Sequence, residues 1–168
     1  MPKIIENLKD RLLAETERQL EEGGYESVTV RSIAKGCGVG VGTVYNYFPS
    51  KEALIAGHLL EDWKQCLESM HAAAEASEIP QPVLQCIFEQ LTGFASRHEA
   101  VFRSKAASSG FAAALGRYHA VLRAQLAEPL QRYCPDEFLA QFVAENLLTW
   151  SMAGKSFDEV YGILKKLF

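Results

Sequence analysis

The chain has 168 residues, of which 48% are hydrophobic and 23% are charged, and its formal net charge is −4 at pH 7. This length allows one sizeable core, or a small domain beside a larger one. No apolar run approaches the ~18 residues that a membrane-spanning helix needs, and Lys3 precedes no apolar block like that of a signal peptide, so we expect a cytoplasmic protein without membrane association.

The first predicted helix covers about residues 4–22, with apolar side chains repeating along one face. Gly23 and Gly24 end this helix, and Tyr25 is expected to pack back against it. A second, short helix follows Thr29, whose hydroxyl is well suited to accept from the free amides of a first helical turn. Gly38 follows the end of this helix, where the chain often needs a positive φ.

A third short helix is predicted to start near Gly40, with Val44 and Phe48 forming one buried stripe. Its other face carries hydrogen-bonding groups of short or rigid reach, namely Thr43, Tyr45, Asn46 and Tyr47. Two short helices joined by a glycine-bearing turn are typical of a helix-turn-helix DNA reader. The plain alternative is a helical corner of a bundle, which does not require this display of polar groups.

The residues from Gly24 to Leu54 resemble the DNA-binding half of the TetR family of bacterial transcriptional regulators. The resemblance lies in Thr-Val-Arg-x-Ile-Ala, then Gly-Val-x-x-Gly-Thr-x-Tyr-x-Tyr-Phe, then Ser-Lys-Glu-x-Leu. It implies an all-α fold of about nine helices. A three-helix DNA-binding domain would occupy residues 1–49, and a helical effector-binding and dimerisation domain would occupy residues 50–168.

The resemblance also implies which residues contact DNA. Thr29, Tyr47 and Lys51 would contact phosphates, and Arg31 would reach a base edge or a phosphate. The full implied set is Thr29, Arg31, Val41, Gly42, Thr43, Tyr45, Asn46, Tyr47 and Lys51. Gly40, Val41 and Gly42 stand where other members carry hydroxyl or longer polar groups, so we expect few direct base contacts and much readout through DNA shape and dimer spacing.

The charge balance predicts modest non-specific DNA binding. Residues 1–60 hold 7 basic and 8 acidic side chains, so this part of the chain is close to neutral. Phosphate affinity must then come from locally placed Lys and Arg side chains and from backbone amides at helix starts.

The rest of the chain is predicted to be helical as well. A long helix starts after Ser50 and ends near Ala76, and residues 75–82 form a connector with two prolines. Further helices are expected over residues 82–97 and 99–107, from Phe111 to Tyr133 with an interruption at Pro129, and after Pro135 and Ser156.

The family resemblance implies a ligand cavity among the middle helices. Candidate lining residues are Trp63, Phe88, Phe94, Phe102, Phe111, Tyr118, His119 and Trp150. At any single position, packing in the core is the simpler reading, because aromatic side chains at helical spacing usually fill cores. The lack of a charge cluster among these residues favours an apolar or aromatic effector.

The last two helices are apolar over much of their surface, so they are either buried in the monomer or form an interface. The resemblance implies that they pair with a second copy as a four-helix bundle. Candidate interface residues are Phe138, Phe142, Leu147, Trp150, Tyr161 and Leu164.

The sequence therefore predicts a dimeric, ligand-responsive repressor that binds a palindromic DNA operator. The alternative is a helix-turn-helix regulator controlled by a protein partner. An enzyme is disfavoured, because no nucleophile, paired-carboxylate or phosphate-loop arrangement is present. The four cysteines and four histidines lack metal-ligand spacing, so we expect neither a metal nor a cofactor.

Overall fold

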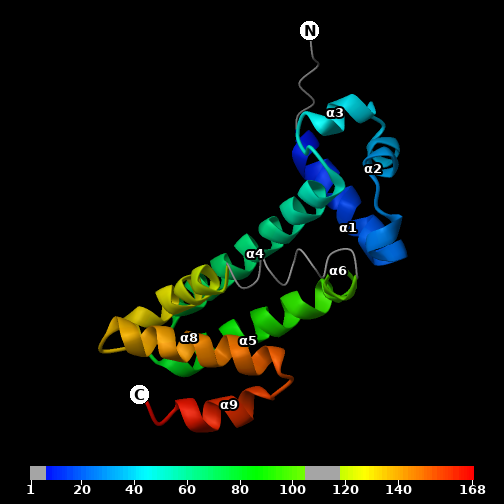
Figure 1. The fold of residues 1–168 in the computed structure, drawn as a ribbon. Helices are drawn as coiled ribbons and strands as arrows, with labels where there is room; N and C mark the ends of the chain where they lie inside the picture. Colours follow the sequence, from blue (N-terminus) through cyan, green and yellow to red (C-terminus); the bar gives the residue numbers. More distant parts are fainter. Residues whose placement is uncertain (1–6, 105–117) are drawn as a thin grey trace. The chain divides into compact units, whose positions relative to one another are not determined.

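The computed structural model describes residues 7–104 and 118–168, and within these residues the chain is helical with no strand (Figure 1). The all-α class is thereby confirmed. The helices are α1 (Leu8–Ser27), α2 (Val30–Cys37), α3 (Val41–Tyr45), α4 (Lys51–Ala76), α5 (Pro80–Arg97), α6 (Glu99–Arg103), a stretch over residues 118–127, the 3₁₀-helix η1 (Glu128–Tyr133), α8 (Glu137–Met152) and α9 (Phe157–Leu164). None of the described helices is long and apolar enough to cross a bilayer.

The chain forms two compact units. The amino-terminal unit comprises Met1–Asp62 and Ala100–Ala107, and the carboxy-terminal unit comprises Trp63–Glu99 and Ser108–Phe168. The expected division at residues 49 and 50 differs from this one, because Leu54 and Ile55 at the start of α4 are buried in the amino-terminal core. As a functional division, the boundary at 49 and 50 stays a prediction.

Local signals place most helix ends where the sequence predicts them. The Thr29 hydroxyl accepts from the Ser32 amide, the Ser50 hydroxyl accepts from the Ala53 amide, and Ser156 caps α9. Gly38 ends α2 with φ of 67°. The α-helix over residues 118–127 gives way to η1 beside Pro129, as expected.

Some helix bounds differ from the expected ones. The first helix extends to Ser27, although Gly24 leaves helical geometry with φ of 68° and turns the chain there. The fifth helix begins at Pro80, because proline fits the first turn of a helix, where its missing N–H would have no partner. Phe111 and the expected break after residue 107 lie outside the described residues.

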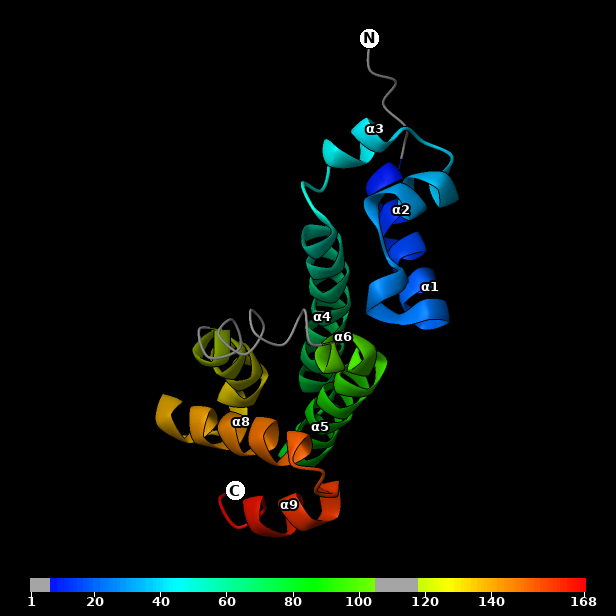
Figure 2. The ribbon, with the colours of Figure 1, turned by 45° about the vertical axis from the view of Figure 1, so that its right-hand side comes forward.

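Each unit has its own apolar core. In the amino-terminal unit, α1, α2, α3, the start of α4 and α6 contribute Leu12, Ile33, Val44, Leu54 and Val101. In the carboxy-terminal unit, α5 and α8 pack together beside η1 and α9. Figures 1 and 2 both show α8 and α9 lying side by side with opposite chain directions.

Candidate nucleic-acid interface

The start of α2 is stabilised by a reciprocal pair of hydrogen bonds. The Thr29 hydroxyl accepts from the Ser32 amide at 3.0 Å, and the Ser32 hydroxyl accepts from the Thr29 amide at 3.0 Å. The Ser32 hydroxyl also lies 2.6 Å from Oε1 of Gln19 on α1. This capping box leaves Thr29 exposed at the surface and ties its position to α1.

The short helix α3 separates buried from exposed side chains as predicted. Val44 and Phe48 are buried in the amino-terminal core, and the Phe48 amide donates to the Val44 carbonyl at 2.9 Å. Tyr45 and Tyr47 are 51% and 42% exposed, and Asn46 between them is exposed as well. Rigid side chains with polar tips therefore extend from a supported backbone.

The first turn of α3 offers little polar reach. Val41 is half-buried and packs against the amino-terminal core, so only part of its side chain faces outward. Thr43 is half-buried, and Gly42 is exposed. A Cβ atom at Gly42 would meet no atom within 4 Å, so this glycine leaves open space in front of the helix. The Val41 side chain is therefore less exposed than its expected groove-facing position suggests.

Packing of α2 on α1 holds the two helices in register. The Arg11 guanidinium donates to the Cys37 carbonyl at 2.8 Å, and the Cys37 thiol contacts the Arg11 carbonyl at 3.4 Å. Burial raises the pKa of the Cys37 thiol. Hydrogen bonds from Arg18 and then Gln19 lower the pKa of Glu15 to about 2. The Glu15 carboxylate occupies the place that a Cβ at Gly36 would take, so the glycine allows this close approach.

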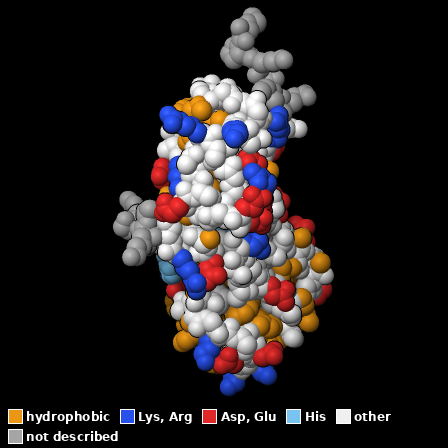
Figure 3. Space-filling view, turned by 90° about the vertical axis from the view of Figure 1, so that its right-hand side faces the viewer, with side chains coloured by type: hydrophobic (Ala, Val, Ile, Leu, Met, Phe, Trp, Pro, Cys, Tyr) orange, Lys and Arg blue, Asp and Glu red, His pale blue; other side chains and the backbone are white. Residues whose placement is uncertain are grey.

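Basic side chains lie around the candidate surface without forming a dense cluster. Arg31 and Lys35 on α2 are exposed, and Lys51 at the start of α4 is half-buried beside Tyr25. Figure 3 shows Lys and Arg side chains near the end of the amino-terminal unit that carries α3, with acidic side chains farther from it. This arrangement suits a few phosphate contacts.

Comparison with known proteins agrees with this geometry. Residues 12–57 match the family model for bacterial regulatory proteins of the tetR family. The HTH-type transcriptional regulator UidR of Escherichia coli is 36% identical over 59 residues, which are 35% of this chain and 30% of UidR. The HTH-type transcriptional repressor KstR of Mycolicibacterium smegmatis is 36% identical over 72 residues, which are 43% of this chain and 35% of KstR.

Solved structures extend the likeness in fold to nearly the whole chain. A TetR/AcrR-family regulator from Thermobifida fusca superposes with a TM-score of 0.58 at 17% identity, covering 95% of this chain and 94% of its own. The fatty acid degradation regulator FadR from Bacillus halodurans gives 0.55 at 20% identity, covering 95% and 91%. Residues 12–57 are therefore similar to regulators of the tetR family, and the chain shares its fold with a solved regulator of that family. Its matched segment spans only about a third of the length of these curated relatives.

The aromatic residues that the sequence assigns to a ligand cavity have different surroundings in the described part of the chain. Trp63 and Phe94 pack edge to face at 5.3 Å between ring centroids, and Phe88 is buried in the same core. Phe102 belongs to the amino-terminal unit, whereas Tyr118 is exposed. His119 lies 3.5 Å from the Glu145 carboxylate, and Phe111 lies outside the described residues. For Trp63, Phe88 and Phe94, core packing is the observed role.

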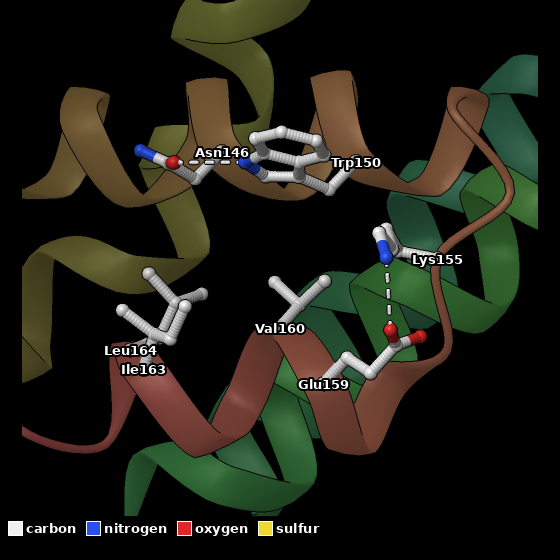
Figure 4. Close-up of a pocket in the computed structure, with 7 residues that line it drawn as sticks. All are labelled: Asn146, Trp150, Lys155, Glu159, Val160, Ile163 and Leu164. Atoms are coloured by element: carbon white, nitrogen blue, oxygen red, sulfur yellow. Dashed lines mark hydrogen bonds and ion pairs between the residues drawn. The ribbon is translucent and has the colours of Figure 1, made fainter.

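Trp150, the last of the eight cavity candidates, helps to line a hollow between α8 and α9. Its volume is about 220 Å³, and its lining residues are Asn146, Trp150, Lys155, Glu159, Val160, Ile163 and Leu164. Figure 4 shows the Trp150 ring above Val160, with the Lys155–Glu159 ion pair of 2.9 Å at one end. The Trp150 indole donates to Asn146 at 3.3 Å. This volume is below the ~300–1,000 Å³ of typical ligand pockets. Most of the lining residues could not be found from the sequence, because they come from two different helices.

The expected interface residues fall into two groups. Phe138, Phe142 and Trp150 are 77%, 45% and 43% exposed, so they lie on the outer face of α8. Leu147 and Leu164 are instead buried in the core of the carboxy-terminal unit, and their place in an interface stays a prediction. Tyr161 is half-buried, with its ring 5.3 Å from that of Phe157. Further exposed apolar residues, which are not among the candidates named from the sequence, are Met152, Ile163, Leu167 and Phe168.

Across residues 7–104 and 118–168, no group of three or more His, Cys, Asp or Glu side chains is arranged to hold a metal ion.

Proposed function

We propose that this chain is a cytoplasmic transcriptional repressor that binds a palindromic DNA operator as a homodimer and responds to a small apolar or aromatic ligand. The single observation that carries the proposal is the α3 surface, where exposed Tyr45, Asn46 and Tyr47 stand over buried Val44 and Phe48. Such a helix presents hydrogen-bonding tips to a DNA groove while its other side is held by the core. The role is binding, with no catalytic step.

The exposed apolar face of α8 and α9 supports dimerisation. Phe138 and Phe142 at the start of α8 and Trp150 near its end leave large apolar side chains uncovered. Monomeric proteins rarely expose large contiguous apolar patches. In a two-fold dimer with antiparallel α8 helices, the start of one α8 meets the end of the other, which brings the acidic Glu137 toward the basic Lys155 of the other copy. The hollow beside Trp150 is then open to an aromatic side chain of the second subunit.

Dimerisation would also supply selectivity. One helix-turn-helix unit touches few bases, and the glycine and valine at the start of α3 add little polar contact. Two units related by a two-fold axis would bind half-sites about 34–36 Å apart, or a multiple of that distance. The operator would therefore be an inverted repeat.

Selection of bound fragments from random-sequence DNA tests the DNA-binding part. The protein should enrich an inverted repeat, and Tyr47→Ala should enrich it poorly while keeping its helical content. Val121→Ala, which removes an exposed side chain of the carboxy-terminal unit, serves as the control. The absence of any enriched sequence with folded protein would contradict the proposal.

Sedimentation equilibrium tests the dimer. The wild-type protein should have twice the 18.6 kDa mass of one chain. Phe138→Glu should shift it to the monomer, whereas Leu60→Glu, which alters a side chain of similar exposure on α4, should not. A monomeric wild type at micromolar concentration would contradict this part.

The effector is tested by measuring operator affinity in the presence of aliphatic and aromatic small molecules. A compound that lowers affinity and raises the unfolding temperature supports a ligand-responsive repressor. The alternative, control by a protein partner, fits the apolar α8–α9 face equally well. It would be favoured if no compound changed DNA affinity while a co-purified protein did.

A further inference from the structure

The ammonium group of Lys51 lies over an aromatic ring. Its Nζ atom is 4.1 Å from the centroid of the Tyr25 ring, well within the ~6 Å reach of a cation–π interaction. Both residues belong to the amino-terminal unit, Tyr25 near the end of α1 and Lys51 at the first position of α4. The Tyr25 ring is therefore one partner of the Lys51 ammonium, beside the negative charge of the adjacent Glu52.

The ring of Tyr25 is fixed, whereas the lysine side chain is long and flexible. Gly24, with φ of 68° and ψ of −174°, turns the chain so that Tyr25 folds back into the core with Leu20 and Val28. Burial, and then the negative charges of Glu52 and Glu26, raise the pKa of the Tyr25 hydroxyl, which keeps the ring a neutral phenol. A buried ring therefore sets the position of the charge above it.

The position of the Lys51 ammonium matters for phosphate binding because of the groups beside it. Lys51 follows Ser50, whose hydroxyl accepts from the Ala53 amide at the start of α4. The positive end of a 26-residue helix therefore lies beside the lysine. Tyr47 comes just before this helix start and is exposed, so one phosphate-binding surface can include both residues.

We propose that Tyr25 is a positioning residue for DNA binding. Its ring holds the Lys51 ammonium ready to pair with a backbone phosphate, so that DNA does not have to order a flexible side chain. The inference rests on the proposed DNA-binding function and assigns a role to a side chain that does not itself face the DNA. Ordering a long side chain on binding normally reduces affinity, and a preformed position avoids that loss.

A double-mutant cycle tests the proposal. The probe is a fluorescein-labelled duplex of random sequence, because phosphate contacts do not depend on sequence. Lys51→Met should weaken binding and lower the slope of log K against log salt by about one. Tyr25→Leu should weaken binding about threefold to tenfold with a reduced slope, and the double variant should bind no worse than Lys51→Met. Tyr25→Phe, which keeps the ring, should match the wild type.

Two results would overturn the proposal. If Tyr25→Leu is folded by circular dichroism and its affinity loss simply adds to that of Lys51→Met, the ring does not act through the lysine. If Tyr25→Leu binds more tightly, the ring withholds the charge from DNA. Failure of the wild type to bind any duplex would contradict the proposed function itself, which distinguishes the two failures.

Tyr25→Leu could destabilise the core, so a second variant preserves shape. Pentafluorophenylalanine at position 25 keeps the ring but reverses the charge of its face, which removes the attraction to a cation. Its affinity and salt slope should fall to those of Tyr25→Leu. Equal affinity for the pentafluorophenylalanine and Tyr25→Phe proteins would overturn the proposal.

Discussion

The surface around α3 and the outer face of α8 and α9 are both exposed, but they differ in chemistry. Around α3 the uncovered side chains are aromatic or amide groups with polar tips, whereas on α8 and α9 they are large and mostly apolar. Polar tips on a rigid backbone suit phosphates and base edges, and apolar side chains suit another protein surface. Beneath each surface lies a buried stripe, Val44 and Phe48 in one case and Val143 and Leu147 in the other. The outer residues can therefore be changed without opening either core.

The largest expected effect is on stability, and it distinguishes a substitution on the buried side of α8 from one on its exposed side. Leu147→Ala should lower the free energy of unfolding by about 2–5 kcal/mol, because this side chain is fully buried and its removal leaves a cavity. Phe142→Ala, on the exposed side, should instead reduce the part of the stability that depends on protein concentration. Urea unfolding at two protein concentrations measures both. Equal, concentration-independent losses would mean that the outer side of α8 forms no interface.

On the α3 surface, Asn46→Ala should change which DNA sites are preferred. If its amide reads an adenine, discrimination at that base pair should fall by about 1–3 kcal/mol. Tyr47→Ala is the matched comparison, because loss of a phosphate contact should lower affinity evenly across sequences. Competition binding with operator variants measures both effects. An even loss for Asn46→Ala would show that it does not read a base.

The hydrogen-bonded carboxylate of Glu15 on α1 should make the stability of the fold depend on pH. Arg18, and then Gln19, lower the pKa of Glu15 from 4.5 to about 2, so the ionised carboxylate stabilises the fold. This stabilisation is complete above about pH 4.5 and disappears as the pH falls through about 2. Glu15→Gln should lower the free energy of unfolding by about 1 kcal/mol at neutral pH.

Urea unfolding from pH 7 down to about pH 2 measures the difference between Glu15→Gln and wild type, which should shrink below the ordinary pKa of the carboxyl group. Glu17→Gln, on the exposed face of the same helix, is the control and should show little change. A difference that stays constant with pH would mean that the charge of Glu15 does not contribute.

The smallest expected effect concerns the start of α3. Gly40 has extended backbone geometry and gives the helix no side-chain cap, and the nearest atom to an added Cβ is the Thr43 hydroxyl at 3.7 Å. Gly40→Ser should therefore raise the free energy of unfolding by a few tenths of a kcal/mol. Thermal unfolding measures this shift, and a lower midpoint would show that the added side chain is not accommodated.

Features that depend on neighbouring residues could be predicted from the sequence. The caps at Thr29, Ser50 and Ser156 and the end of the α-helix beside Pro129 involve only a few adjacent positions. The same holds for the division of α3 into a buried and an exposed side. The spacing of its apolar residues indicates the buried side, and the glycines before it indicate where the helix starts.

Features that depend on packing between distant helices could not be predicted. α8 is apolar around most of its circumference, so periodicity alone does not tell that Leu147 points inward and Phe142 outward. Nor does the sequence indicate that Trp63 and Phe94, both candidates for a cavity, pack edge to face against each other. The ring of Tyr25 was expected to pack back, yet only the structure brings Lys51 over it.

Helix α4 has a consequence for how the chain can be cut into pieces. Its 26 residues supply Leu54 and Ile55 to one core and Cys66, Met70 and Ala74 to the other, with no linker between the two stretches. The described residues 100–104, which follow α5 in the sequence, also belong to the amino-terminal unit. A fragment that stops at Asp62 loses Val101 from its core, and one that starts at Trp63 begins in mid-helix. A single cut therefore separates the two units of this chain only by leaving apolar surface uncovered on both fragments.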